Sequence, residues 1–260
     1  MDPRFPTLLA VLLFSNVAGT QQLDSPVVDS GQIACYDDDA EITPPTSGLA
    51  YYGQDAQYSG EDFRYTDNGD GTISDDVTGL MWQQMPELYN KKSYDDALSE
   101  ASSFNLAGHT DWRLPTVKEL YSLINHTGSS QTLTPYIDTN YFGFRWGDTS
   151  LGERSIDVQY WSSTEYVGRI YQGDEAVFGV NFGDGRIKGY PRYNGPNGVP
   201  ENFVRYVRDN PNYGVNQFYD NGDGTIPDLA TGLMWTQADS GSDLIWEDAL
   251  AWAEGLNFAG

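Results

Sequence analysis

Two turns in this chain are rich in side-chain oxygens, the ligands that calcium prefers in proteins. The heptapeptide Asp-Asn-Gly-Asp-Gly-Thr-Ile begins at Asp67 and begins again at Asp220. An EF-hand loop is excluded, because its first position would fall on Thr66 and its last position also lacks a carboxylate. Two interpretations stay open: Asp67, Asp70 and Asp75 form a looser calcium site, or these carboxylates only accept hydrogen bonds within their own turns.

Histidine and cysteine are too scarce for the common metal and catalytic sites. The histidines are His109 and His126, and the single cysteine is Cys35. The sequence therefore has neither a Cys/His metal cluster nor the two thiols of an internal disulfide. The hydroxyl groups at residues 162–164 do not sit in a Gly-x-Ser-x-Gly elbow, so hydrolysis would depend on the fold bringing a histidine to them. We expect no catalytic activity and no cofactor, apart from the open question of calcium.

The charge of the chain limits what it binds. Asp and Glu number 38 against 14 Lys and Arg, which gives a formal net charge of -24. A field of that sign repels nucleic acids, sulfated glycans and anionic lipid headgroups, and it attracts cations. Nucleic acid is therefore excluded as a partner, and a sulfated glycan is disfavoured.

The N-terminus has the pattern of an export signal. Arg4 supplies a positive start, residues 8–14 are mostly apolar, and residues 17–19 are small enough for a signal peptidase site. A buried N-terminal strand is the alternative. The apolar run is too short to span a membrane and no other segment is long enough, so we predict no membrane span. We expect residues 1–19 to be a signal peptide and the protein to be secreted, extracytoplasmic or held at the cell surface.

Turn residues and periodicity predict the elements that position these side chains. Residues 20–61 are rich in Asp, Pro and Gly and predict an extended lead-in with one or two short strands. Asn-Gly and Asp-Gly at residues 68–71 predict a β-hairpin, and a further turn at Gly79 leads into another strand. A helix is expected to begin at Ser93 and to end at Gly108.

The middle of the chain predicts a second helix and then more strands. Thr116 and Glu119 have capping-box spacing, so this helix begins at Thr116. The later pattern is that of strands at residues 160–164, 176–182 and 203–207, separated by glycine-rich turns. The expected class is α+β, with two helices set against a twisted, largely antiparallel sheet.

The Asp-rich turns also mark an internal duplication. In both places Thr-Gly-Leu-Met-Trp follows at the same spacing and ends at Trp82 or at Trp235. Helical sequence then follows in each copy, which indicates a repeated unit. Residues 62–209 are expected to form a complete domain, and residues 217–260 are expected to be a truncated second copy.

Four motifs in this order resemble the Lcl C-terminal domain family. They are the Asp-rich turn, the Thr-Gly-Leu-Met-Trp strand, Asp-Trp-Arg-Leu-Pro-Thr at residues 111–116 and Trp-Ser-Ser-Thr at residues 161–164. The Arg-Leu-Pro-Thr segment is also similar to sulfatase-modifying domains, which implies a C-type-lectin-like fold. The copper-dependent oxidation of those domains needs a pair of cysteines, and Cys35 alone does not provide it.

The resemblance singles out six motif residues. Its tryptophans are expected to anchor the core, as buried aromatic residues do in small domains. Its arginine is expected either to contact a ligand or to form an internal salt bridge or aromatic stack. The six residues are Trp82, Trp112, Arg113, Pro115, Glu119 and Trp161.

Two departures from the family pattern affect the expected ligand. Relatives often pair a lead-in cysteine with one in the strand at residues 203–207, where this chain has Tyr206, so Cys35 lacks that mate. The namesake of the family is an adhesin that binds sulfated glycosaminoglycans, and this needs a positive surface that a chain of charge -24 lacks. That ligand is not expected here.

The function expected from the sequence is binding or adhesion outside the cytoplasm, without catalysis. An unknown ligand, such as a carbohydrate or another surface polymer, would contact the aromatic and acid-rich loops at residues 141–146 and 168–174. A secreted enzyme of unrecognised mechanism and a purely structural surface repeat stay open as alternatives. A deep pocket that holds His109 or His126 beside a serine or a carboxylate would favour the enzyme.

Overall fold

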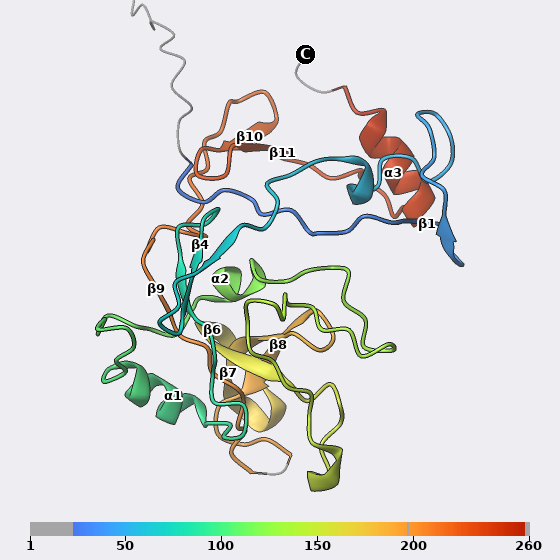
Figure 1. Ribbon diagram of the computed structural model, residues 1–260. Coiled ribbons are helices and arrows are strands. Elements are labelled where there is room, and N and C mark those ends of the chain that lie inside the picture. Colours follow the sequence, from blue (N-terminus) through green and yellow to red (C-terminus); the bar gives the residue numbers. More distant parts are fainter. Residues whose placement is uncertain (1–22, 197, 258–260) are drawn as a thin grey trace, which may run out of the picture.

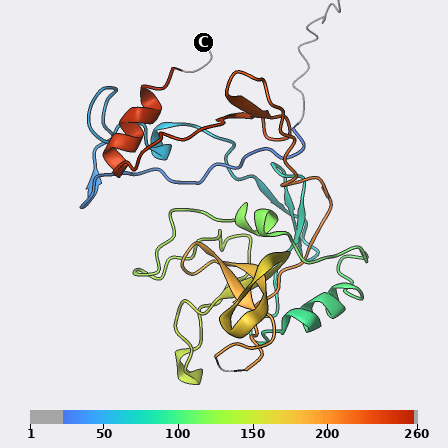
Figure 2. The same ribbon diagram turned by 180° about the vertical axis from the view of Figure 1, so that it is seen from behind.

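The chain is arranged in two layers. The computed structural model describes residues 23–196 and 198–257. We call residues 62–209 the first unit and residues 217–257 the second unit. The lead-in and the second unit lie together in one layer, and the first unit forms most of the other (Figures 1 and 2). The expected signal peptide lies outside the described residues.

The Asp-rich turn of the first unit joins two strands of a four-stranded antiparallel sheet. The strands lie in the order β3 (Tyr65–Asp67), β4 (Thr72–Asp75), β5 (Met81–Gln83) and β9 (Val207–Arg208). The turn needs glycine, because Gly71 has a φ of 91°. The predicted hairpin and the strand after Gly79 are present. β9 comes from the far end of the unit and pairs with β5, so the sheet ties the ends of the unit together.

The first helix is shorter than predicted. α1 spans Tyr94–Ala101, and the Ser93 side chain caps its first turn. The prediction that it ends at Gly108 is wrong, because the chain turns after Ala101 and the backbones of Leu106 and His109 pair in a bridge. Gly108 lies inside that turn, with a φ of 80°.

The second helix begins where the sequence predicts. α2 spans Val117–Tyr121, and both hydrogen bonds of the capping box between Thr116 and Glu119 are present. Leu120 and Leu123 are buried. The capping box therefore fixes the start of a very short helix, and burial of its apolar face holds it against the core.

The second half of the first unit forms a separate three-stranded antiparallel sheet. Its strands are β6 (Gln159–Ile170), β7 (Asp174–Asn181) and β8 (Arg186–Pro191). The fold is α+β, but the helices stand against two sheets rather than one. The strand predicted at residues 203–207 forms only at its end, because Phe203 makes a single bridge to β6. Two short 3-10 helices lie before and after β6: η2 (Thr149–Leu151) and η3 (Tyr171–Gly173).

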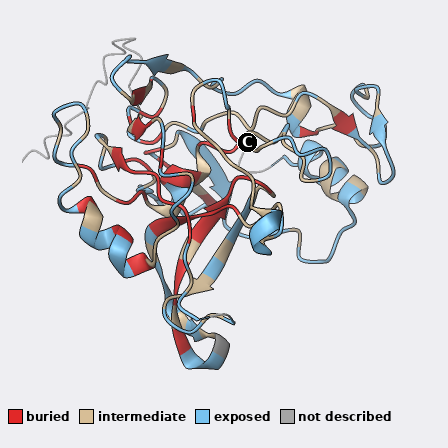
Figure 3. Ribbon diagram, turned by 60° about the horizontal axis from the view of Figure 1, so that its bottom comes forward, coloured by how far each residue is buried: buried red, intermediate tan, exposed pale blue. Residues whose placement is uncertain are grey.

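Two groups of buried apolar side chains hold the first unit together. One includes Ile73 and Trp82 from the first sheet, Leu120 from α2 and Phe182 after β7. The other surrounds Trp161 and includes side chains of α1. Figure 3 shows buried segments along the strands and mixed burial along the helices.

The lead-in packs on both units. Its strands β1 (Cys35–Tyr36) and β2 (Glu41–Ile42) form a small antiparallel hairpin, and η1 (Asp55–Gln57) follows. Backbone hydrogen bonds join the lead-in to the second unit at Ala230 and to the first unit at His126. Residues of the lead-in therefore contact both units.

The second unit contains one hairpin and one helix among its described residues. β10 (Thr225–Asp228) and β11 (Leu233–Thr236) pair antiparallel, and α3 spans Trp246–Glu254. None of the helices in the described part of the chain has the length and the apolar character needed to cross a membrane.

The turn of the second unit has the same local geometry as that of the first. The Asn221 amide donates to the carbonyl of Thr225 at 3.2 Å, and the corresponding bond from Asn68 to Thr72 measures 3.1 Å. Gly71, which precedes β4, has a φ of 91°, and Gly224, which precedes β10, has a φ of 89°.

Candidate functional site

The Arg-Leu-Pro-Thr motif forms an internal ion pair. The two terminal nitrogens of Arg113 donate to the Glu119 carboxylate at 2.8 and 2.6 Å. The Glu119 side chain is 1% exposed and also accepts the Thr116 amide at 2.7 Å. Bidentate pairs of this kind fix geometry as well as charge. Of the roles expected for Arg113, the structure shows the salt bridge.

The Trp-Ser-Ser-Thr motif holds the start of α2 in place. The amide and the hydroxyl of Ser163 both donate to the Pro115 carbonyl, at 2.7 and 3.2 Å. The Val117 amide donates to the Thr164 hydroxyl at 3.0 Å. The Ser162 hydroxyl donates to a carbonyl of β7 at 2.6 Å. All three hydroxyls are thus engaged with backbone groups.

The three motif tryptophans lie in the core. Trp82 and Trp161 are 0% exposed, and Trp112 is 3% exposed. The Trp161 indole donates to the Lys92 carbonyl at 2.8 Å and lies edge-on to Tyr94. These three side chains therefore stabilise the core and are not exposed for contact with a ligand.

The carboxylates considered as calcium ligands each accept bonds from their own turn. Asp67 accepts the Gly69 amide at 2.8 Å, and Asp70 accepts the amide and the hydroxyl of Thr72 at 3.1 and 2.6 Å. Asp75 accepts two amides that follow it, each at 3.1 Å. No group of three or more His, Cys, Asp or Glu side chains within residues 23–196 and 198–257 could hold a metal ion. The turn interpretation therefore explains these contacts, and calcium binding stays a prediction.

The acidity of two of these carboxylates shifts in opposite directions. The hydrogen bond from the Thr72 hydroxyl lowers the pKa of Asp70 below its usual 3.8. Burial raises the pKa of Asp75, whose residue is 3% exposed. A carboxylate that resists ionisation is a poor cation ligand, which further favours a structural role for Asp75.

The two histidines lie in different surroundings. The His109 backbone pairs with Leu106, and the His126 ring lies edge-on to Tyr121 with ring centroids 6.1 Å apart. Within the described residues, neither imidazole is hydrogen-bonded to a hydroxyl or a carboxylate, and the absence of catalysis stays a prediction.

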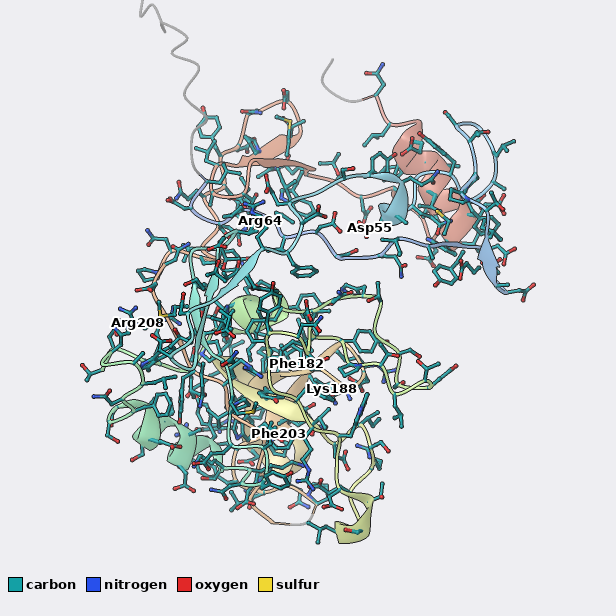
Figure 4. The ribbon with its side chains drawn as sticks, in the orientation of Figure 1. Asp55, Arg64, Phe182, Lys188, Phe203 and Arg208 are labelled. Atoms are coloured by element: carbon teal, nitrogen blue, oxygen red, sulfur yellow. The ribbon has the colours of Figure 1, made fainter. Side chains whose placement is uncertain are left out.

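An open cleft lies where the lead-in meets both units, and we call it the acidic cleft. Its volume is about 750 Å³. Apolar lining comes from Leu23, Val27, Val28, Val77 and Leu233. Charged lining comes from Asp29, Asp55, Glu61, Arg64 and Asp76. Figure 4 shows Asp55 and Arg64 in the layer that contains the lead-in.

The charges of the acidic cleft are only partly engaged. Arg64 pairs with Glu61 at 3.0 Å, but both side chains are more than half exposed, at 54% and 58%. Asp76 accepts the Thr66 hydroxyl at 2.8 Å, and Asp55 accepts the Ser30 hydroxyl. Because carboxylates outnumber the guanidinium here, the cleft concentrates a negative field.

A smaller hollow of about 370 Å³ shares a wall, residues 26–30, with the acidic cleft. Its opposite side is formed by α2 and by His126. Lys118 lines it and donates from Nζ to the Gly214 carbonyl at 2.6 Å. This hollow thus combines a cation with His126, whereas the acidic cleft carries most of the carboxylates.

Comparison with protein families identifies the first unit. The family described as Lcl C-terminal domain matches residues 71–208, more than half of the chain. The chain belongs to this family. No curated protein and no solved structure matched the chain. The matched range of the Lcl C-terminal domain starts in the Asp-rich turn and ends with β9, so it includes the three-stranded sheet and every strand of the four-stranded sheet except β3.

The two loops predicted to contact a ligand differ in how far their side chains are exposed. In residues 141–146, Phe142 is 1% exposed and packs edge-on against Tyr65, whereas the other five residues are partly exposed, so ligand contact by this loop stays a prediction. Residues 168–174 form the tip between β6 and β7, next to Val167, whose side chain is fully exposed.

Sequence reasoning missed the charged residues of the acidic cleft. Asp29, Asp55 and Glu61 come from the lead-in, Arg64 lies just before β3, and Asp76 follows β4 between two family motifs without belonging to either. The general acidity of the chain was their only signal, and it does not indicate which carboxylates meet.

Proposed function

We propose that this protein is a non-catalytic binding module, secreted or held at the cell surface, and that a glycan or another surface polymer binds in the acidic cleft. The observation that carries the proposal is the cleft itself, with its mixed carboxylate and apolar lining. Carboxylates accept O–H and N–H donors, and apolar groups pack on the carbon faces of a sugar. The ligand is neutral or cationic, because the negative field repels sulfated chains.

The family motifs support binding over catalysis. The Arg113–Glu119 pair and the hydroxyls of residues 162–164 already bond within the fold, which leaves them no role in attack on a substrate. The alternative of a secreted enzyme rests on the smaller hollow, where His126 shares the lining with Asp29 and Ser30. Breakdown of a bound polymer, lost on replacement of His126, would favour that alternative.

A glycan and polymer array with the full chain tests the proposal. Asp55→Asn and Asp76→Asn should each weaken binding of the captured ligand about tenfold, since a hydrogen bond to a charged group contributes roughly 1.5 kcal/mol or more. Asp243→Asn is the matched control, because Asp243 is an exposed carboxylate outside the cleft lining. Equal loss in all three variants, or no captured ligand, would refute the assignment.

The same array, repeated with and without calcium, tests the metal prediction. Calorimetric titration of calcium into the full chain should give heat if Asp67, Asp70 and Asp75 take up the ion. No heat at millimolar calcium would remove calcium from the proposed function and leave the cleft as a metal-free site.

We also propose that the second unit repeats the first part of the Lcl C-terminal domain, and that the first unit is a C-type-lectin-like scaffold. Support for the repeat comes from the shared heptapeptide and from the equivalent turn bonds of Asn68 and Asn221. Support for the scaffold comes from the Arg-Leu-Pro-Thr resemblance. An experimental structure whose strand order differs from that of lectin-like domains would reject the scaffold.

A further inference from the structure

The chain that runs from β9 to β10 passes beside α2 (Figure 1). Lys118 lies on α2, and its Nζ donates to the Gly214 carbonyl at 2.6 Å and to the side-chain oxygen of Asn216. These contacts join residues that are 96 and 98 positions apart in the sequence. An amine of the first unit is therefore in direct contact with a carboxamide of the segment that leads into the second unit.

The nitrogen of this carboxamide contacts a buried carboxylate. Asn216 Nδ2 donates to the Asp228 Oδ2, and Asp228 is 1% exposed. The other oxygen of Asp228 accepts the amides of Gln217 and Ala230 at 2.8 and 3.2 Å. Burial alone would raise the pKa of Asp228, but these hydrogen bonds outweigh it and lower the pKa. An ionised carboxylate, which can accept a proton, therefore lies beside the amide nitrogen.

The segment that carries the carboxamide is held in place from several sides. Tyr213 is 8% exposed and belongs to the core of the first unit. The Gly214 amide donates to the Ser25 hydroxyl at 2.9 Å. Gly214 has a φ of 80°, and a Cβ there would lie 3.0 Å from the Cβ of Lys118. Glycine thus leaves room for the lysine stem, and the fold holds the amine and the carboxamide together before any reaction.

We propose that Lys118 and Asn216 form an isopeptide bond, with Asp228 as the catalytic residue that moves the proton. The neutral Nζ attacks Cγ of Asn216, so that the Nζ–Cγ bond forms and the Cγ–Nδ2 bond breaks. While both nitrogens are bonded to Cγ, Asp228 takes the proton from Nζ and gives it to the leaving Nδ2. Ammonia departs, and the step needs no oxidant, reductant or other reactant.

Exposure to solvent makes this reaction slow. Lys118 and Asn216 are both exposed. Lysine amines in water are mostly protonated at neutral pH, so only a small neutral fraction attacks. The bond nevertheless accumulates, because the released ammonia is lost to the solvent. It ties α2 covalently to the segment before β10, which goes beyond the proposed function and does not depend on the acidic cleft.

Peptide mapping of the full chain after incubation at mildly alkaline pH, where more of a lysine amine is neutral, tests the proposal. Trypsin does not cleave after an acylated lysine, so the bond should give one branched peptide of residues 114–145 and 209–260, lighter than its two parts by one ammonia molecule. Lys118→Arg keeps a hydrogen-bond donor and Asn216→Ala removes the carboxamide, and each should abolish the branched peptide. Lys188→Arg is the matched control and should retain it, because Lys188 forms an ion pair elsewhere.

The rate of bond formation tests the carboxylate. Asp228→Asn should slow formation of the branched peptide about a hundredfold, since general acid–base catalysis contributes that much or more. Lys118 and Asn216 are exposed, so their variants are expected to fold whatever happens at Asp228. No branched peptide in the wild type after prolonged incubation would overturn the proposal. So would a branched peptide that persists in Asn216→Ala, or one that forms at the wild-type rate in a folded Asp228→Asn chain.

Discussion

Replacing Trp82 by alanine should destabilise the first unit far more than the same change at Trp235 destabilises the second. Trp82 is completely buried, and its indole nitrogen has no hydrogen-bond partner. The cost is therefore that of transfer and cavity formation alone, about 3–5 kcal/mol for a buried tryptophan. Trp235 is more than half exposed, at 54%, so its loss leaves no enclosed cavity and costs less than about 2 kcal/mol.

Hydrogen exchange in increasing urea measures both effects without assuming that the units unfold together. Amides of β4 and β5 should lose protection at lower urea in Trp82→Ala, and amides of β10 and β11 should change little in Trp235→Ala. Trp82→Phe is the control for ring packing and should cost much less than alanine. A Trp82→Ala chain within about 1 kcal/mol of wild type, or a Trp235→Ala chain with an equal loss, would refute the assignment of core and surface.

Three further predictions concern buried charges. Glu119→Ala should cost about 3 kcal/mol, since it removes one partner of a largely buried pair, and a double-mutant cycle in urea with Arg113→Ala should show clear coupling between the two residues. Asp174 is 6% exposed; burial alone would raise its pKa, but the amides of Asn194 and Tyr193 outweigh this and lower it below 3.8. The Asp174 carboxylate therefore contributes stability above pH 3.8, and this contribution is lost as the pH falls below that value. The Tm of Asp174→Asn should be clearly below that of the wild type at pH 6, and the difference should be smaller at pH 3. Arg205→Met should cost roughly 3 kcal/mol in urea unfolding, because three backbone carbonyls lose their donor.

Local features of the fold follow from the sequence because their causes are local. The Asp-rich hairpin needs only glycine at positive φ, and the start of α2 needs only the Thr116–Glu119 box. The end of α1 was predicted wrongly, since Gly108 serves a later turn instead of a helix end. The segment at residues 203–207 has strand composition, but it crosses from β6 to β5 and so pairs with each only briefly.

Long-range features could not be predicted in this way. Arg205 is fully buried and donates to the carbonyls of Gln83, Gln84 and Gly143, which are distant in the sequence. No spacing rule connects these positions. The acidic cleft has the same origin, because its lining is assembled from the lead-in and from both units. Tertiary packing decides such sites, and a single sequence carries little trace of it.

The burial of Cys35 gives the protein a natural reporter. Its sulfur is the only thiol in the chain, and the residue is 1% exposed within the β1–β2 hairpin. A thiol reagent can reach it only when the residues that cover it move away, because the thiolate must be accessible to react. The rate of chemical labelling at Cys35 therefore reports the opening of this part of the lead-in. A ligand that holds the lead-in against the two units should lower that rate.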